Sequence, residues 1–152
     1  MAKTRKTWRE KLEPEGVPKL VDDPRGRGKI LVPAPLDVDA LIRRVEKGKL
    51  ITDKQIRERL ASNFNADLTC PMTTGIFIRI VAEAAEEGLR EGTKEITPYW
   101  RVIKPDGSLN EKFPGGVEEQ AARLREEGHI IELGKSKKGL RVKDFQKSLQ
   151  KL

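Results

Sequence analysis

The spacing of apolar residues predicts a short strand and then a helix in the first third of the chain. Residues 30–32 form an apolar run of strand length, which the prolines at positions 33 and 35 end. From about Asp37 to Lys47, apolar residues recur on one side of a helical turn while basic residues fall mainly on the others. Gly48 is expected to end this helix, whose buried face comprises Leu41, Ile42 and Val45.

Two further helices follow, joined by a polar turn at residues 63–67. The second begins at a capping box, in which the Thr52 hydroxyl and the Gln55 side chain each bond to a free backbone amide. The third has Pro71 at its first position and reaches about Arg90. The residues expected on the inner faces are Ile56 and Leu60 in the second helix, and Ile76, Phe77, Ile80, Val81 and Ala84 in the third. Such a pair outlines a helix-turn-helix.

Beyond the third helix the pattern predicts a strand, a helix and a hairpin. Residues 97–103 are expected to be extended, and residues 117–127 to be helical, because apolar residues recur there every three or four positions. Residues 129–133 and 140–142 are expected to pair around a Gly- and Lys-rich loop, and a last helix starts at Asp144. The predicted fold class is mainly α with a small β-element. It is a winged helix-turn-helix domain with a basic N-terminal arm and a C-terminal hairpin plus helix.

Positive charge is concentrated at the two ends of the chain. Residues 1–30 carry 9 Lys and Arg against 5 Asp and Glu, residues 134–152 carry 7 against 1, and the middle has a net charge of −3. Prolines and glycines interrupt residues 1–30, which predicts an arm without regular secondary structure. We therefore expect three parts: the basic arm at 1–30, the winged-helix domain at 31–129, and a basic hairpin with a helix at 130–152.

The overall charge of +7 and the pI of about 9.6 suit a polyanionic partner, because each neutralised phosphate releases counterions. Cys70 is the only cysteine, which excludes an internal disulfide and a cysteine cluster for metal, and no metal or other cofactor is expected. No apolar run follows the first residues, and no stretch approaches about 18 apolar residues. We expect a cytoplasmic protein with no membrane partner.

Three motifs in the second half of the chain occur in a defined order. They are Pro98-Tyr99-Trp100-Arg101-Val102-Ile103, the turn Gly115-Gly116, and the run Leu124-Arg125-Glu126-Glu127-Gly128. In order and spacing they resemble the DNA-binding domain of the O6-alkylguanine-DNA alkyltransferases, whose signature is Pro-Cys-His-Arg-Val, a Gly-Gly turn and a helix ending in Glu-Gly. The resemblance extends from about Val38 to His129. It implies a domain that binds duplex DNA.

The resemblance places Tyr99 at the family's cysteine and Trp100 at its histidine. Neither side chain supplies the thiolate and base that alkyl transfer needs. The resemblance therefore implies recognition without turnover, as in the alkyltransferase-like proteins, which bind alkylated guanine and signal to repair proteins. Two base-flipping residues of the family are also replaced, the tyrosine by Asp53 and the arginine by Gly75 or Thr74. By carry-over, the base pocket is bordered by Tyr99, Trp100, Val102, Phe113 and Pro114, although Tyr99 or Trp100 could instead pack in the core.

The resemblance and the charge pattern together indicate which residues would contact DNA. On the third helix these are Thr73, Thr74 and Arg79, although both threonines could instead cap the helix. On the hairpin, the candidates are the basic residues of the wing, Lys135, Lys137, Lys138 and Arg141. These side chains would hold phosphates, or they could form a solvated loop. Structural roles are expected for Arg101, Gly115, Gly116 and Glu127. Arg101 and Glu127 would form either a buried link or a surface pair.

Two other functions remain open from the sequence. The basic arms could bind RNA or a ribonucleoprotein, with the helix-turn-helix as a scaffold. Alternatively, Cys70 could act as a nucleophile, because backbone amides at a helix start lower the pKa of a thiol, whereas a lone cysteine can equally pack or cap. Duplex DNA is the expected partner, and RNA and repair proteins are the alternatives.

Overall fold

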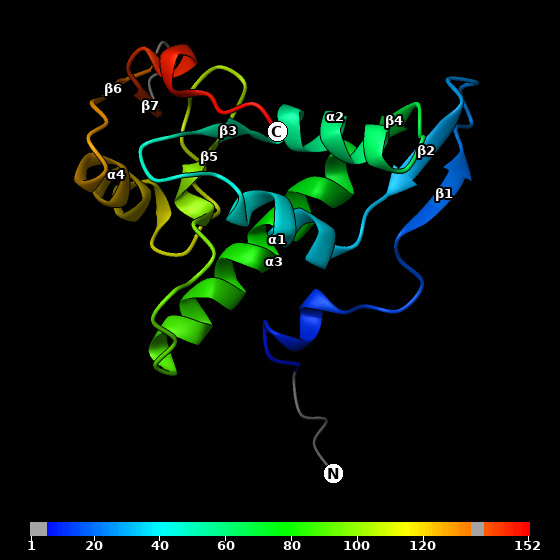
Figure 1. Ribbon diagram of the computed structural model, residues 1–152, viewed down its shortest axis with the longest axis horizontal. Helices are drawn as coiled ribbons and strands as arrows, with labels where there is room; N and C mark the ends of the chain where they lie inside the picture. The colour runs from blue at the N-terminus through cyan, green and yellow to red at the C-terminus, as the bar shows by residue number, and fades with distance from the viewer. Residues whose placement is uncertain (1–5, 135–138) are drawn as a thin grey trace.

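The computed structural model describes residues 6–134 and 139–152, in which the long helix α3 packs against shorter helices and small sheets (Figure 1). The helices are α1 (Pro35–Arg43), α2 (Asp53–Asn63), α3 (Pro71–Arg90) and α4 (Gly116–Glu126), with short 3-10 helices η1 (Glu10–Leu12), η2 (Tyr99–Arg101) and η3 (Phe145–Ser148). In Figure 1, α1 lies in front of α3, and α4 lies on the side opposite to the first two strands.

Within the described residues the strands form three small sheets. They are β1 (Lys19–Asp22), β2 (Lys29–Val32) and β4 (Leu68–Thr69); β3 (Ile51–Thr52) and β5 (Val102–Ile103); and β6 (Ile131–Leu133) and β7 (Leu140–Val142). β1 and β2 are antiparallel, as are β6 and β7, whereas β2 and β4 are parallel. β3 and β5 are also parallel, with Ile51 opposite Val102. This last pair joins the start of α2 to the segment that follows η2.

The buried apolar side chains of the described chain form two clusters. The larger cluster joins α1, α2, α3 and η2, and includes Ile42 and Ile78. The smaller cluster lies between α4, β5 and the C-terminal hairpin, and includes Leu124 and Phe145. Trp100 packs against both clusters. Its side chain therefore connects the two halves of the core.

The second and third helices follow their sequence signals. The Gln55 N–H donates to Thr52 Oγ1 at 3.1 Å, and the Thr52 N–H donates to Gln55 Oε1 at 2.9 Å, so the predicted capping box is complete. α3 runs from Pro71 to Arg90, as predicted. The predicted hairpin is confirmed by the pairing of β6 with β7. These features depend on signals that are local in sequence.

Residues 97–103 do not form the predicted strand. Only Val102 and Ile103 are extended, whereas residues 99–101 form η2. Pro98 has no N–H to donate to a sheet, and the Tyr99 N–H bonds to the Thr97 carbonyl at 2.8 Å, which turns the chain. Consequently, neighbouring side chains of this segment do not alternate between the two faces of a strand.

Two other predicted helices have different bounds. α1 begins at Pro35 rather than at Asp37, because proline suits the first turn of a helix. It ends at Arg43, and the next two amides bond to carbonyls three residues back, which tightens the chain. The helix predicted from Asp144 is only the 3-10 helix η3.

The buried face of α3 is rotated from the predicted one. Its buried residues are Thr74, Ile78, Val81, Ala82 and Ala85. Of the residues predicted to face inward, Val81 is buried, Phe77, Ile80 and Ala84 are half-buried, and Ile76 is 53% exposed. Contact with α1 and α2 decides which residues are covered. The apolar spacing alone could not distinguish this stripe from the adjacent one.

The segment before β2 contains regular structure that the sequence did not predict. β1 pairs with β2, and η1 lies against α3. The backbone N–H groups of Trp8 and Arg9 donate to the Glu87 carboxylate at 3.1 and 3.2 Å, and Leu12 packs on the larger core cluster. The described part of this segment is therefore anchored along α3.

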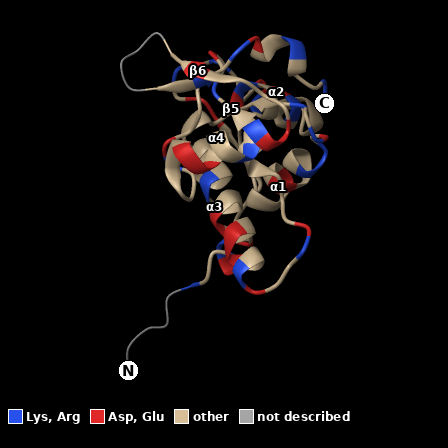
Figure 2. Ribbon diagram, turned by 90° about the vertical axis from the view of Figure 1, so that its left-hand side faces the viewer, with Lys and Arg blue, Asp and Glu red and all other residues tan. Residues whose placement is uncertain are grey.

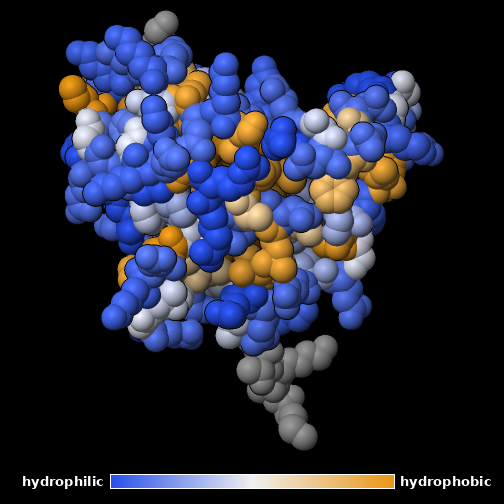
Figure 3. Space-filling model, in the orientation of Figure 1, coloured by the Kyte–Doolittle hydropathy of each residue, from blue (hydrophilic) through white to orange (hydrophobic). Residues whose placement is uncertain are grey.

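Most of the surface seen in Figure 3 is hydrophilic. Apolar side chains show at several places on this face, among them the hairpin of β1 and β2, where Leu20 and Val21 are exposed. Among the residues that the structure describes, no helix combines the length and the apolar character needed to cross a membrane.

Replacing Thr52 by Ala should lower the free energy of unfolding by about 1–2 kcal/mol, because the Gln55 amide loses its side-chain acceptor. The matched control is Ser62→Ala, at an exposed position in the last turn of the same helix, which should change it by less than about 0.5 kcal/mol. Urea unfolding at neutral pH measures both. Equal effects would contradict a stabilising role of the capping box.

Candidate nucleic-acid interface

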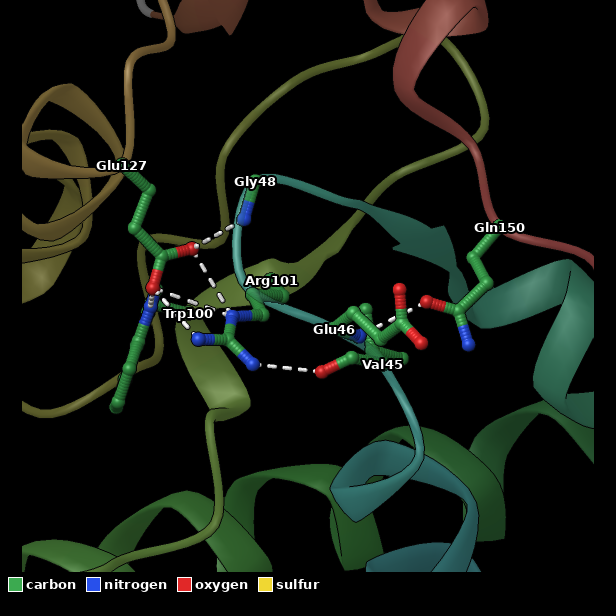
Figure 4. Close-up of polar contacts among 7 residues, drawn as sticks. All are labelled: Val45, Glu46, Gly48, Trp100, Arg101, Glu127 and Gln150. Carbon is green, nitrogen blue, oxygen red and sulfur yellow. Dashed lines mark hydrogen bonds and ion pairs between the residues drawn. The ribbon is translucent and has the colours of Figure 1, made fainter.

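Arg101 and Glu127 form a largely buried ion pair between η2 and the end of α4 (Figure 4). Arg101 Nη2 lies 2.8 Å from Glu127 Oε2, and Arg101 Nε donates to Glu127 Oε1 at 2.9 Å. Arg101 Nη1 donates to the Val45 carbonyl at 2.6 Å, in the loop after α1. One guanidinium therefore connects η2, α4 and the loop between α1 and β3.

Glu127 has two more hydrogen-bond donors. Trp100 Nε1 donates to its Oε2 at 3.0 Å, and the Gly48 N–H donates to its Oε1 at 3.4 Å. Burial opposes ionisation of this carboxyl, but the Arg101 guanidinium and the Trp100 indole outweigh burial and hold the pKa of Glu127 below its ordinary value. The carboxylate is therefore charged at neutral pH, and its ion pair with Arg101 has the predicted structural role of holding η2 to the end of α4.

Tyr99 occupies the position that resembles the alkyltransferase nucleophile, and it lies in the core. Its side chain is 1% exposed, and its hydroxyl donates to Glu86 Oε1 at 2.6 Å. Arg123 Nη2 lies 2.6 Å from the same oxygen. Burial, and then the hydrogen bond to Glu86, raise the pKa of Tyr99 above its ordinary value, so the phenol stays protonated. The residue links η2 to α3.

The side chains predicted to border a base pocket pack against one another. The rings of Phe113 and Trp100 meet the Tyr99 ring edge to face, with centroids 5.2 and 5.4 Å away. Tyr99, Val102 and Phe113 are buried, whereas Trp100 and Pro114 are half-buried. The structure corrects the predicted pocket here, because three of its five residues lie in the core, where they are not exposed to a bound base.

Gly115 and Gly116 form the turn that leads into α4. Both have a left-handed backbone, with φ of +78° and +68°. A Cβ atom on Gly115 would lie 2.6 Å from the Cβ of Glu119, which real side chains do not tolerate. The turn therefore requires glycine for structural reasons.

Gln120 is a positioning residue that the sequence analysis missed. Its buried Nε2 donates to the carbonyls of Trp100 and Val102 at 3.0 and 2.9 Å, and its Oε1 accepts the Asn110 N–H at 2.8 Å. It therefore holds the loop after β5 against η2. The available signal was a polar residue within the apolar face of a helix, where burial requires partners.

The threonines at the start of α3 bond within the helix. The buried Thr74 hydroxyl donates to the Cys70 carbonyl at 2.7 Å, so the predicted contact of Thr74 with DNA is not available. The half-buried Thr73 hydroxyl donates to Cys70 Sγ at 3.2 Å. Burial opposes ionisation of the Cys70 thiol, but this bond and the amides of Thr73 and Met72 outweigh it and lower the pKa of Cys70. No histidine or carboxylate contributes to that shift.

The predicted wing is described only in part. Arg141 Nε lies 3.1 Å from Glu132 Oε1 across the hairpin of β6 and β7, and the Arg141 side chain is mostly covered. Lys135, Lys137 and Lys138 lie outside the described residues. Arg141, which was predicted to contact phosphates, therefore pairs with a carboxylate of its own hairpin.

An open groove of about 510 Å³ runs between the first half of α3 and the loop at residues 104–112. On the α3 side it is lined by Ile80 and by Met72 and Ile76, which are 78% and 53% exposed. Trp8, from the segment before η1, adds an aromatic ring. The volume falls within the range of about 300–1,000 Å³ that is usual for ligand sites.

Positive charge surrounds this groove. The lining carries one carboxylate, Glu111, against Lys11, Arg79, Lys104 and Lys112. α3 is itself divided, because residues 71–80 include Arg79 and no acid, whereas Figure 2 shows acidic residues in its second half, Glu83, Glu86 and Glu87. The helix dipole adds positive potential at the first half. An anion is therefore favoured at the groove.

Of the residues predicted to contact DNA, the structure places Arg79 on the groove, where its Cζ lies 5.9 Å from the centroid of the Trp8 ring. Trp8, Lys11, Lys104 and Lys112 were missed. They come from two segments far apart in sequence, and only the fold brings them together beside Arg79 of α3.

Replacing Glu127 by Gln should lower the free energy of unfolding by about 3 kcal/mol near pH 7, because the Arg101 guanidinium loses its carboxylate. Since folding depresses the pKa of Glu127, its stabilisation is present above the carboxyl's ordinary pKa of 4.5 and is lost as pH falls through the lower value of the folded protein. The difference from wild type should therefore shrink as the pH falls below 4.5.

The matched control is Glu126→Gln, one residue earlier and exposed, which should change stability by less than about 0.5 kcal/mol. Urea unfolding at several pH values measures both variants. A difference between Glu127→Gln and wild type that does not change with pH would rule out a role for the charge.

Solved structures of an alkyltransferase-like protein share this fold. S. pombe Atl1 in complex with damaged DNA containing O6-carboxymethylguanine gives a TM-score of 0.53, and S. pombe ATL in complex with DNA gives 0.55, each at 20% sequence identity. Each alignment covers 78% of this chain and 94% of the other. No protein-family model matches the sequence, and no curated protein matches it. The chain is therefore similar in fold to these proteins.

Proposed function

We propose that this protein binds duplex DNA through the groove between α3 and the loop at 104–112, without catalysis. The observation that carries the proposal is the position of Lys11, Arg79, Lys104 and Lys112 around one groove with an apolar floor. The fold shared with Atl1, whose structure holds damaged DNA, supports the same partner. Cations in this arrangement neutralise phosphates and release counterions, which makes binding dependent on salt.

The uneven distribution of charge along α3 determines how the duplex is oriented on the protein. Phosphates approach the first half of the helix, which has the positive end of the dipole and no acid, and avoid the second half with its three glutamates. In this proposal the hairpin of β6 and β7 acts as the wing of a winged helix. Lys143 is exposed directly after β7 and would supply a cation for the backbone of the duplex.

The recognised feature is proposed to be a damaged or alkylated base. Tyr99 is buried and protonated at the nucleophile position, and the Cys70 thiol bonds to a threonine hydroxyl rather than to a base. No histidine or carboxylate contributes to the lowered pKa of Cys70, so this thiol has no paired base. Met72 and Ile76 offer an apolar surface for a base that has left the stack. Binding would then mark the lesion for repair proteins.

Titration of two matched duplexes, one with O6-methylguanine and one with guanine, at two salt concentrations tests this function. The double variant Lys104→Ala/Lys112→Ala should weaken binding of both duplexes. It should also reduce the slope of log K against log salt by about 2, since about one phosphate contact is lost per lysine. Fluorescence anisotropy of the labelled duplex measures affinity and slope together.

The control is Lys47→Ala/Lys49→Ala, which removes the same charge from exposed positions outside the groove lining and should leave the slope nearly unchanged. Preference for the lesion supports damage recognition, and equal binding supports general duplex binding. Tighter binding of single-stranded RNA than of either duplex would favour the RNA adaptor. Absence of salt-dependent affinity for every duplex would contradict the proposal.

A further inference from the structure

The segment that carries Trp8 is anchored without the help of its indole. The backbone N–H groups of Trp8 and Arg9 bond to the Glu87 carboxylate, and Leu12 packs on the larger core cluster. Among the described residues, the Trp8 side chain belongs to neither core cluster. It is half exposed and lines the groove. The anchoring of this segment therefore does not account for the position of the Trp8 side chain at the groove.

The surroundings of the indole combine charge with apolar surface. Lys11 Nζ lies 4.1 Å from the ring centroid of Trp8, and Arg79 Cζ lies 5.9 Å from it. Met72 and Ile76 are exposed in the same groove. Binding of an unstacked base needs an aromatic or apolar surface for the base and cations for the phosphates beside it. Both are present within one groove.

We infer that Trp8 stacks on a nucleobase held outside the double helix, while Lys11 and Arg79 contact the phosphates that flank it. This inference rests on the proposed function, and it names the side chain that receives the base. At the position resembling the alkyltransferase site, Tyr99 is buried, and Trp100 is bonded to Glu127 and packs against both core clusters, so they leave that task to another residue. Trp8 is the aromatic residue of the groove lining.

The cation on the ring does not prevent stacking. A lysine over an exposed aromatic ring contributes about 2- to 5-fold to an equilibrium constant, whereas a stacked base contributes about 5- to 150-fold. A base therefore displaces the Lys11 ammonium from Trp8. The long, flexible lysine side chain can then turn to a phosphate, so its charge contributes in both states.

The test uses the full chain and a duplex with a single unpaired guanine. Tryptophan emission of the wild type should be quenched at saturation, because a stacked base quenches the indole. Trp8→Phe keeps a ring and should keep most of the affinity, but it should lose the quenching, since Trp100 is bonded to Glu127 and packed against both core clusters. Trp8→Ala should weaken binding by about 5- to 150-fold.

The matched control is Leu20→Ala, which removes an exposed apolar side chain from β1, outside the groove lining, and should bind as wild type does. Wild-type affinity in Trp8→Ala, together with weak binding by Lys104→Ala/Lys112→Ala, would overturn the stacking inference and leave the proposed function standing. Undiminished quenching in Trp8→Phe would overturn it as well, even if Trp8→Ala failed to fold. No binding by the wild type would overturn both.

Discussion

The ion pair between Arg101 and Glu127 is the contact on which the arrangement of η2, α4 and the loop after α1 depends. A carboxylate at the end of a helix faces the negative end of the helix dipole, which disfavours it. Glu127 is stable there because a guanidinium, an indole N–H and a backbone N–H surround it. The largely buried guanidinium needs the carboxylate in turn, since an unpaired buried charge costs several kcal/mol.

This constraint also determines what the neighbouring aromatic residues can do. With Arg101 held to α4, the tight turn of η2 directs Tyr99 toward Glu86 of α3 and leaves Trp100 between the two core clusters. The two positions that resemble a reactive cysteine and its histidine therefore stabilise the fold. An interface must therefore use groups that this packing leaves exposed. Such groups line the groove beside the loop at 104–112, which Gln120 holds in place.

The parts of the fold that could be predicted from the sequence are those with local causes. The capping box at Thr52, Pro71 at the start of α3 and the hairpin of β6 and β7 each involve residues close together in the chain. η2 was missed although its backbone bonds are local, because the side-chain partners that hold it, such as Glu127, lie far along the chain. The groove was missed because Trp8 stands alone among charged residues, prolines and glycines and belongs to no periodic pattern.

The acidic half of α3 shows how one helix can build the fold and orient a partner at once. Glu86 accepts hydrogen bonds from Tyr99 and Arg123, and Glu87 accepts the two amides that anchor the segment carrying Trp8. These carboxylates are charged partners for structural groups, yet they also make this end of the helix unfavourable for phosphates. Glu87, which anchors the segment carrying the indole, therefore also helps to direct a polyanion to the groove at the other half of the helix.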